Sequence, residues 1–111
     1  MFCKGSEDGY RQALDGIQLK ALVQGERTLL VEFRLQKGSA LPRHSHPYEQ
    51  TGYLLSGRIR LFIGDRVCEA GPGDSWSIPM NSEHRAEILA DAVAIEVFAP
   101  VREDYLPAAG S

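Results

Sequence analysis

The sequence has no long apolar segment: its longest uninterrupted apolar run, Ala92 to Ile95, is four residues, whereas a membrane-spanning helix needs about 20. Cysteine is scarce, because Cys3 and Cys68 are the only two, and they do not form a metal-type pair. The amino terminus, Met-Phe-Cys-Lys-Gly-Ser-Glu-Asp, lacks the apolar region of a signal peptide. We therefore expect a cytoplasmic protein that does not enter a membrane and that keeps both thiols reduced.

An excess of basic residues is also absent. Lysine and arginine number 12 against 15 aspartate and glutamate residues, for a net charge of −3, and the basic residues are scattered along the chain. This distribution argues against a nucleic-acid partner. The 111 residues, 43% of them hydrophobic, are enough for one domain with its own core.

Helical periodicity is missing from nearly the whole chain. Only residues 10–15, between Gly9 and Gly16, favour a turn or a short helix. From Ile17 onward apolar residues recur with a period of two, which is typical of strands with one buried face. Strands are expected at 17–23, 29–36, 58–63, 66–68, 76–78, 84–89 and 92–98.

With so many short strands and no helices to cover a parallel sheet, the fold class is all-β, a sandwich or small barrel in one domain. The barrel core is expected at about 17–100, with a carboxyl-terminal tail at 103–111 whose last residues, 108–111, fray. Cys68 alternates with Val67 in a hairpin strand and is expected to be a small core residue. Trp76 is expected in the core or at a subunit interface, and less so in a cavity.

All three histidines fall within two short segments, His44-Ser45-His46 and His84. Residues i and i+2 of a strand share a face, so His44 and His46 converge, and Gln50 has the same parity. Taken alone, the pair is equally consistent with surface histidines in a loop flanked by proline.

The spacing around these histidines is more informative. Gly38, His44-x-His46, Gln50 and Gly57 are followed, after fifteen residues, by Gly73, Pro79-x-Asn81 and His84. This arrangement resembles the two signature motifs of the cupin superfamily over residues 38–88. The resemblance implies a single-domain cupin, a double-stranded β-helix or jelly-roll barrel, with His44, His46, Gln50 and His84 as metal ligands.

Two positions depart from that pattern. Asn81 replaces a usual glycine, and asparagine tolerates the left-handed backbone better than other non-glycine residues. Gln50 replaces a usual glutamate, so the four ligands are neutral and leave the charge of a divalent ion uncompensated. Such a site favours Lewis acidity and an anionic substrate. One divalent transition metal per chain is expected, and Ni, Mn, Fe, Co and Zn all suit these donors.

Glu96 is the one charged residue in the apolar segment 94–98. A carboxylate in a strand that is buried on both faces costs several kcal/mol unless it is paired or used. One interpretation pairs Glu96 with Arg58 or Arg60 inside the barrel. The other places it, with Phe98 on the same face, in the cavity that holds the metal.

The segments Gln50-Thr51-Gly52-Tyr53 and 96–105 resemble the KdgF-type pectin-degradation cupins, which linearise 4,5-unsaturated uronates. In that family an acid, a phenylalanine and an arginine follow at i, i+2 and i+6, which correspond here to Glu96, Phe98 and Arg102. The resemblance implies that Glu96 is the general acid and base, that the metal and Arg102 hold the carboxylate of a small sugar acid, and that Phe98 shapes the pocket. The family acid is aspartate, so Glu96 is one methylene longer.

Two other functions fit the same residues: a metal-dependent dioxygenase, and a non-catalytic metal- or sugar-binding module. The family resemblance and the edge strands that need cover also predict a homodimer.

Overall fold

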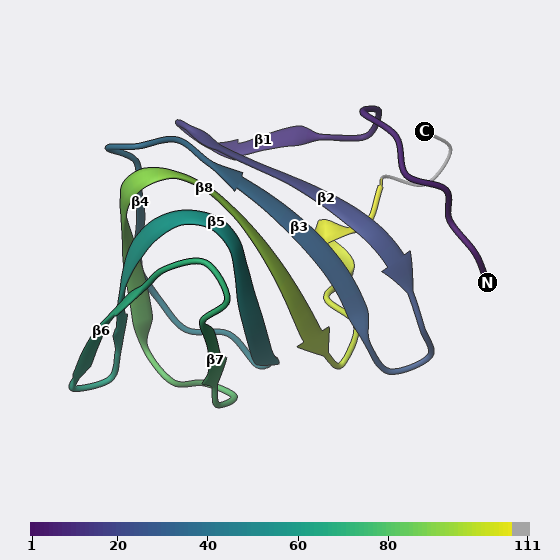
Figure 1. Ribbon diagram of the computed structural model, residues 1–111. Helices are drawn as coiled ribbons and strands as arrows, with labels where there is room; N and C mark the ends of the chain where they lie inside the picture. The colour runs from purple at the N-terminus through teal and green to yellow at the C-terminus, as the bar shows by residue number, and fades with distance from the viewer. Residues whose placement is uncertain (108–111) are drawn as a thin grey trace.

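Two long strands form the centre of the fold. The computed structural model describes residues 1–107, and in it β5 (Glu49–Ile63) and β8 (His84–Ala99) pair antiparallel along nearly their whole lengths. Both strands curve strongly (Figure 1). In β5 the register shifts around Ser56 and Arg58, beside Gly57, which takes a φ of 89°. A Cβ at Gly57 would lie 2.2 Å from the carbonyl oxygen of Asp91, so only glycine fits where the two strands bend past each other.

The other strands extend both halves of this curved pair. The first half of β5 pairs with β7 (Ser75–Ile78), and its second half pairs with β6 (Arg66–Ala70). The start of β8 pairs with β4 (Ala40–His44), and its end pairs with β3 (Leu29–Leu35). β3 is followed outward by β2 (Ile17–Gln24) and β1 (Arg11–Leu14). The predicted all-β jelly-roll barrel is therefore confirmed.

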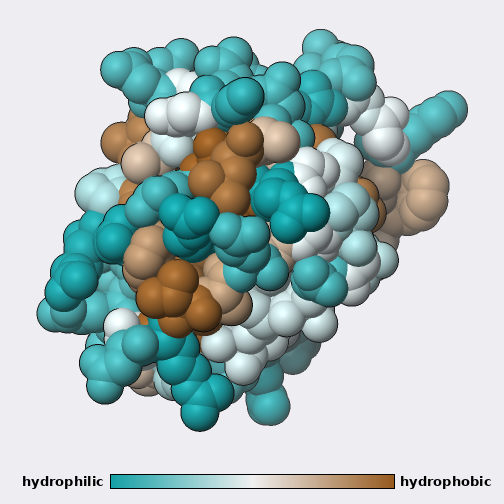
Figure 2. All heavy atoms as spheres, turned by 60° about the vertical axis from the view of Figure 1, so that its left-hand side comes forward, coloured by the Kyte–Doolittle hydropathy of each residue, from teal (hydrophilic) through white to brown (hydrophobic). Residues whose placement is uncertain are grey.

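The core lies between the two curved halves. Strand β3 shows strict alternation, since Leu29, Val31, Phe33 and Leu35 are buried and the residues between them are only half-buried. The inward-facing residues of β8 continue the same core from His84 to Phe98. The surface seen in Figure 2 is mainly hydrophilic, with apolar side chains between the polar ones.

Residues 10–15, for which the sequence predicts a turn or short helix, instead contain strand β1. Its residues pair with β2, and Asp15 and Gly16 form the two-residue turn between the strands. An Asp-Gly pair with glycine at a φ of 74° is a strong hairpin signal. Pairing with the open edge of β2 outweighs the weak helical propensity of so short a segment.

Cys68 is the second correction. It was expected in the core, but its side chain is exposed, as is that of Cys3. Strand β6 lies at the edge of the sheet order and pairs with β5, so four of its five residues are exposed and only Ala70 is buried.

The prediction for the turn at Asn81 agrees with the structure. Asn81 takes a φ of 63°, the left-handed conformation expected of it in place of glycine. Gly64 and Asp65 form the turn between β5 and β6.

After β8 the chain forms a short 3-10 helix, η1 (Glu103–Tyr105). The expected fraying of 108–111 lies outside the described residues. Within residues 1–107, the structure has no helix with the length and hydropathy that a membrane span requires.

Candidate metal centre

The strand register gathers the three histidines at one place. His44 ends β4 and is paired with His84, the first residue of β8, while His46 follows two residues after His44. One ring nitrogen from each of the three lies within 4.8 Å of the others. Gln50, near the start of β5, is paired with Phe98 on β8, and its amide oxygen lies 3.1 Å from Nε2 of His46.

Backbone carbonyls fix how these imidazoles present their nitrogens. In each histidine Nδ1 lies within hydrogen-bond distance of a carbonyl oxygen two residues away. A neutral imidazole that donates from Nδ1 carries its lone pair on Nε2, the atom left to bind a metal. The three contacts are His44 with Pro42 at 2.8 Å, His46 with Tyr48 at 3.2 Å, and His84 with Ser82 at 2.8 Å.

The Nε2 atoms of His46 and His84 have no hydrogen-bond donor among the described residues, as expected of atoms available to bind a cation. Nε2 of His84 is buried and has no hydrogen-bond partner among the described residues. Nε2 of His46 faces the amide oxygen of Gln50. The orientation of that amide is set on its other side, where its nitrogen donates to Oε1 of Glu96 at 2.6 Å. Two acceptors therefore point at each other, and a bound metal ion satisfies both of them. The residues fit a metal site.

Burial favours the neutral form of His46 and His84, the form that a metal ligand requires. It lowers the pKa of His84 to about 4, and the neighbouring His44 and His46 add to the shift. Burial also lowers the pKa of His46, as does the positive charge of Arg102. At neutral pH no proton competes strongly for these lone pairs, so metal binding need not displace one.

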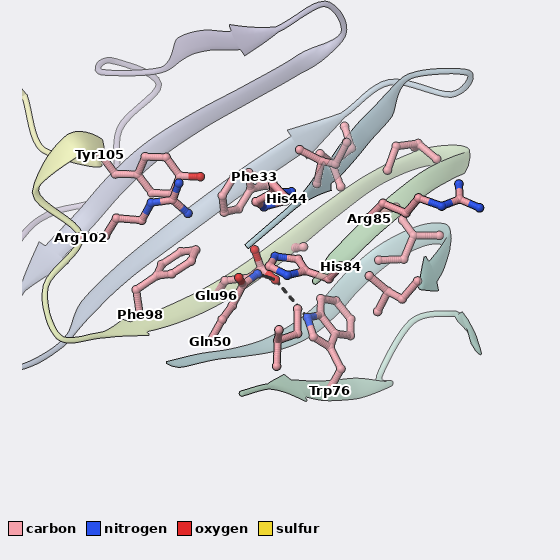
Figure 3. Close-up of a pocket in the computed structure, with 18 residues that line it drawn as sticks. Phe33, His44, Gln50, Trp76, His84, Arg85, Glu96, Phe98, Arg102 and Tyr105 are labelled. Carbon is pink, nitrogen blue, oxygen red and sulfur yellow. Dashed lines mark hydrogen bonds between the residues drawn. The ribbon is translucent and has the colours of Figure 1, made fainter. Parts of the chain in front are cut away.

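Glu96 faces the interior. Its side chain is 7% exposed, and Oε1 accepts hydrogen bonds from Nε2 of Gln50 at 2.6 Å and from Nε1 of Trp76 at 3.0 Å (Figure 3). Burial raises the pKa of Glu96, although both hydrogen bonds oppose that shift. Glu96 is therefore one hydrogen bond away from the histidine cluster, through Gln50.

The alternative pairing of Glu96 with a core arginine is not formed. Arg58 and Arg60 both point to Glu69, at 3.6 and 2.8 Å, on the outside of the barrel. Their side chains are 55% and 37% exposed, so they remain solvated and leave Glu96 to the donors inside the cavity.

Trp76 lines the cavity, a place that the sequence did not favour for it. Gly52 on β5 stands between Glu96 on β8 and Trp76 on β7 in the register of the sheet. A Cβ at Gly52 would lie 2.3 Å from the indole ring. The missing side chain lets the indole lie over β5 and reach Glu96. A glycine inside an alternating strand is the sequence signal that could have shown this close approach.

Phe98 and Arg102 lie beside the cluster on the side of η1. Phe98 is 1% exposed, and its ring is edge-on to that of His46 at 6.0 Å. The side chain of Arg102 is 14% exposed, and its Nε donates to the carboxylate of Asp104 at 3.1 Å. Its terminal nitrogens have no hydrogen-bond partner within residues 1–107.

These groups share one cavity inside the barrel. His44, Gln50, His84, Glu96 and Arg102 all line it, and the rest of its wall is mostly apolar. Figure 3 shows Gln50, His84 and Glu96 close together, with Arg102 and Phe98 on one side of them and Trp76 on another. A few polar groups converging in an apolar cavity are typical of a small-molecule site.

Comparison with known proteins agrees with this geometry. Residues 31–99 match the family model of the cupin domain. The structure of KdgF from Halomonas sp. is similar with a TM-score of 0.89 and 26% identity, over 96% of this chain and all of that one. No curated protein matches the chain.

Two further solved structures share the fold alone. An RmlC-like cupin from Shewanella frigidimarina has a TM-score of 0.89 at 21% identity, over 96% of both chains. A predicted oxalate decarboxylase from Thermotoga maritima has a TM-score of 0.78 at 17% identity, over 90% of this chain and 99% of that one.

Proposed function

The chain belongs to the cupin domain family, and on that premise we propose that it is a metal-dependent enzyme that linearises 4,5-unsaturated uronates to 5-keto-4-deoxyuronates. One observation carries the proposal. His44, His84 and Gln50 of the histidine cluster, the buried acid Glu96 and the arginine Arg102 line a single cavity, and His46 completes the cluster beside Gln50. The similarity to KdgF from Halomonas sp. over nearly the whole chain supports the same reaction.

Arg102 binds the carboxylate of the substrate. Its terminal nitrogens have no partner within residues 1–107, while Nε is held by Asp104. A planar guanidinium forms two parallel hydrogen bonds to a carboxylate, which fixes the orientation of the ring as well as its position. The anionic substrate also suits a metal site whose four ligands carry no charge.

Glu96 moves the proton. Its Oε1 is held by Gln50 and Trp76, so Oε2 is the atom free to face the substrate. The carboxyl group donates a proton to C4 of the unsaturated ring, and a water molecule adds its hydroxyl at C5. The remaining water proton returns to Glu96, which is restored. The hemiketal then opens: its hydroxyl proton passes to the ring oxygen, the C5 ketone forms as the bond between C5 and the ring oxygen breaks, and the aldehyde hydrate left at C1 releases water.

Phe98 and the apolar part of the wall exclude bulk water, which strengthens the interactions of Glu96 and Arg102 with the substrate. His44, His46, Gln50 and His84 would hold the metal. When bound, a divalent ion supplies Lewis acidity and lowers the pKa of a coordinated water.

The test follows the ultraviolet absorbance of the conjugated double bond of 4,5-unsaturated galacturonate. Protein loaded in turn with Ni, Mn, Fe, Co or Zn is compared with the spontaneous rate. We expect faster loss of absorbance with at least one ion, abolished by a chelator and restored by adding that ion back. If metal analysis shows a loaded protein and no ion gives acceleration, the proposed reaction is wrong.

A further inference from the structure

Tyr105 occupies a position in the cavity to which the sequence assigns no function. It ends the 3-10 helix η1, and its ring packs edge-on against Phe98 and Phe33, with centroids 5.4 and 5.9 Å apart. The guanidinium carbon of Arg102 lies 3.9 Å from the centre of the same ring. These contacts hold Tyr105 and Arg102 side by side on the same wall of the cavity (Figure 3).

The hydroxyl group of Tyr105 has no hydrogen-bond partner within residues 1–107, although the residue lines the cavity. In Figure 3 this hydroxyl points away from η1, toward the labelled Phe33 and His44. The hydroxyl oxygen is not among the buried side-chain atoms that lack a partner, so it is open to water. Here the aromatic ring is packed and its polar end faces the space where a ligand binds.

Tyr105 lies in the part of the wall that separates the inner cavity from an outer groove. Tyr105, Arg102 and His44 line both the inner cavity and a groove on its outer side, where strand β1 forms the opposite wall. Arg11 of β1 holds η1 there, because its guanidinium donates to the carbonyl oxygen of Asp104 at 2.8 Å. A ligand that reaches the histidine cluster from this groove passes between these side chains.

The phenol is a neutral donor in this setting. Burial raises its pKa to about 12, so the proton stays on the oxygen at any working pH. A phenolic O–H beside a guanidinium is suited to a carboxylate, which accepts several hydrogen bonds at once. Without a ligand the hydroxyl forms no bond with the described part of the protein, so a substrate that offers an acceptor replaces water at this hydroxyl and breaks no hydrogen bond within the protein.

From this geometry we propose that Tyr105 is a substrate-binding residue, whose hydroxyl donates to the same carboxylate that Arg102 binds. The inference rests on the proposed function for the identity of the substrate as a uronate. It extends that function by assigning two residues of one segment, Arg102 and Tyr105, to recognition of the acid group, so neutral sugars are excluded.

The experiment measures binding of galacturonate, which lacks the reactive double bond, to metal-loaded protein by isothermal titration calorimetry. The variant is Tyr105→Phe, which keeps the aromatic contacts and removes the hydroxyl. We expect its dissociation constant to rise about tenfold, equivalent to about 1.4 kcal/mol. Galactose, which lacks the carboxylate, is expected not to bind either protein. The control variant is Tyr53→Phe on the outer face of β5, where the tyrosine is 47% exposed.

Thermal unfolding and metal content show whether the fold and the metal site are intact, and we expect both to be unchanged in Tyr105→Phe. Equal dissociation constants for wild type and variant would overturn the role of Tyr105, even if the wild type is active on unsaturated uronate. Weaker binding by the variant, with a wild type that does not turn over unsaturated uronate, would support Tyr105 and refute the proposed reaction. A wild type that does not bind galacturonate would refute recognition of the carboxylate by Arg102 and Tyr105, whereas the absorbance assay with unsaturated uronate decides the reaction separately.

Discussion

Replacement of Glu96 by glutamine separates a chemical role from a structural one. In the wild type Oε1 accepts hydrogen bonds from Gln50 at 2.6 Å and from Trp76 at 3.0 Å. The amide oxygen of a glutamine at the same position can accept both. Its NH₂ group then takes the place of Oε2, which faces the cavity, so the variant should keep the arrangement of Gln50 and hence of the metal site.

The expected loss of activity follows from the removal of the proton-transfer group. A positioned acid or base contributes about 10²- to 10⁴-fold, so kcat/KM for unsaturated uronate should fall by that factor, or about 3–5 kcal/mol in activation free energy. Bound metal per chain should not change. The matched control is Glu87→Gln on the same strand, where the glutamate side chain is 40% exposed and its carboxylate pairs with Arg60 and Arg85. That variant should retain wild-type kcat/KM.

Stability should change in the opposite direction from activity. Because burial raises the pKa of Glu96 above its ordinary value of 4.5, the folded protein holds this proton more tightly than the unfolded chain. Its contribution to stability is present below pH 4.5 and is lost as the pH rises through the folded-state pKa. Metal-free Glu96→Gln should therefore have a higher Tm than the wild type at pH 8, and the two should converge near pH 4.

Wild-type kcat/KM in Glu96→Gln, with metal content unchanged, would refute Glu96 as the proton-transfer group. A loss of activity accompanied by an equal loss of bound metal would show that Glu96 acts by holding Gln50, and the mechanism proposed above would then be wrong for this residue.

Three further predictions concern the surroundings of the site. Gly52→Ala should lower the free energy of unfolding by about 1–3 kcal/mol, because its Cβ would lie 2.3 Å from Trp76. Urea denaturation measures this difference. The control, Gly5→Ala, has open space around the added methyl group and should show no change. The metal-free protein should lose stability as the pH falls from 6.5 toward 4. The pKa of His84 is lowered to about 4 in the folded protein, so the unfolded chain binds that proton at a higher pH. A Tm that does not change over this range would contradict the burial of a neutral His84. Arg102→Lys keeps the charge but not the planar fork, so KM for unsaturated uronate should rise about tenfold with metal content unchanged; an unaltered KM would remove Arg102 from carboxylate binding.

Local patterns in the sequence were sufficient to predict the fold class and the histidine cluster. Period-two alternation depends on neighbouring residues, since each side chain of a strand points opposite to the next. It identified most of the strands from Ile17 onward, but it missed β4 and the first half of β5 and divided β8 into two strands. The positions of His44, His46 and His84 relative to glycine and proline are likewise read along the chain, and they were enough to indicate a cupin and a metal site.

The tertiary structure decided what depends on pairing between distant segments. Strand β1 forms because β2 offers it an edge, and a local propensity cannot show that edge. Cys68 is exposed because β6 lies at the border of the sheet, although its alternation resembles that of a buried strand. Both errors have the same cause: whether a face or an edge is covered depends on segments remote in sequence.

The contacts inside the cavity also depend on segments that are remote in sequence. The sequence identified Glu96 but left two partners open, and only the register of β5, β7 and β8 gave it Gln50 and Trp76 in place of Arg58 or Arg60. Tyr105 joined the site because the chain turns back after β8 and packs its ring on Phe33 and Phe98. The sequence by itself determined which residues can bind a metal or move a proton, and the three-dimensional packing determined which of them meet.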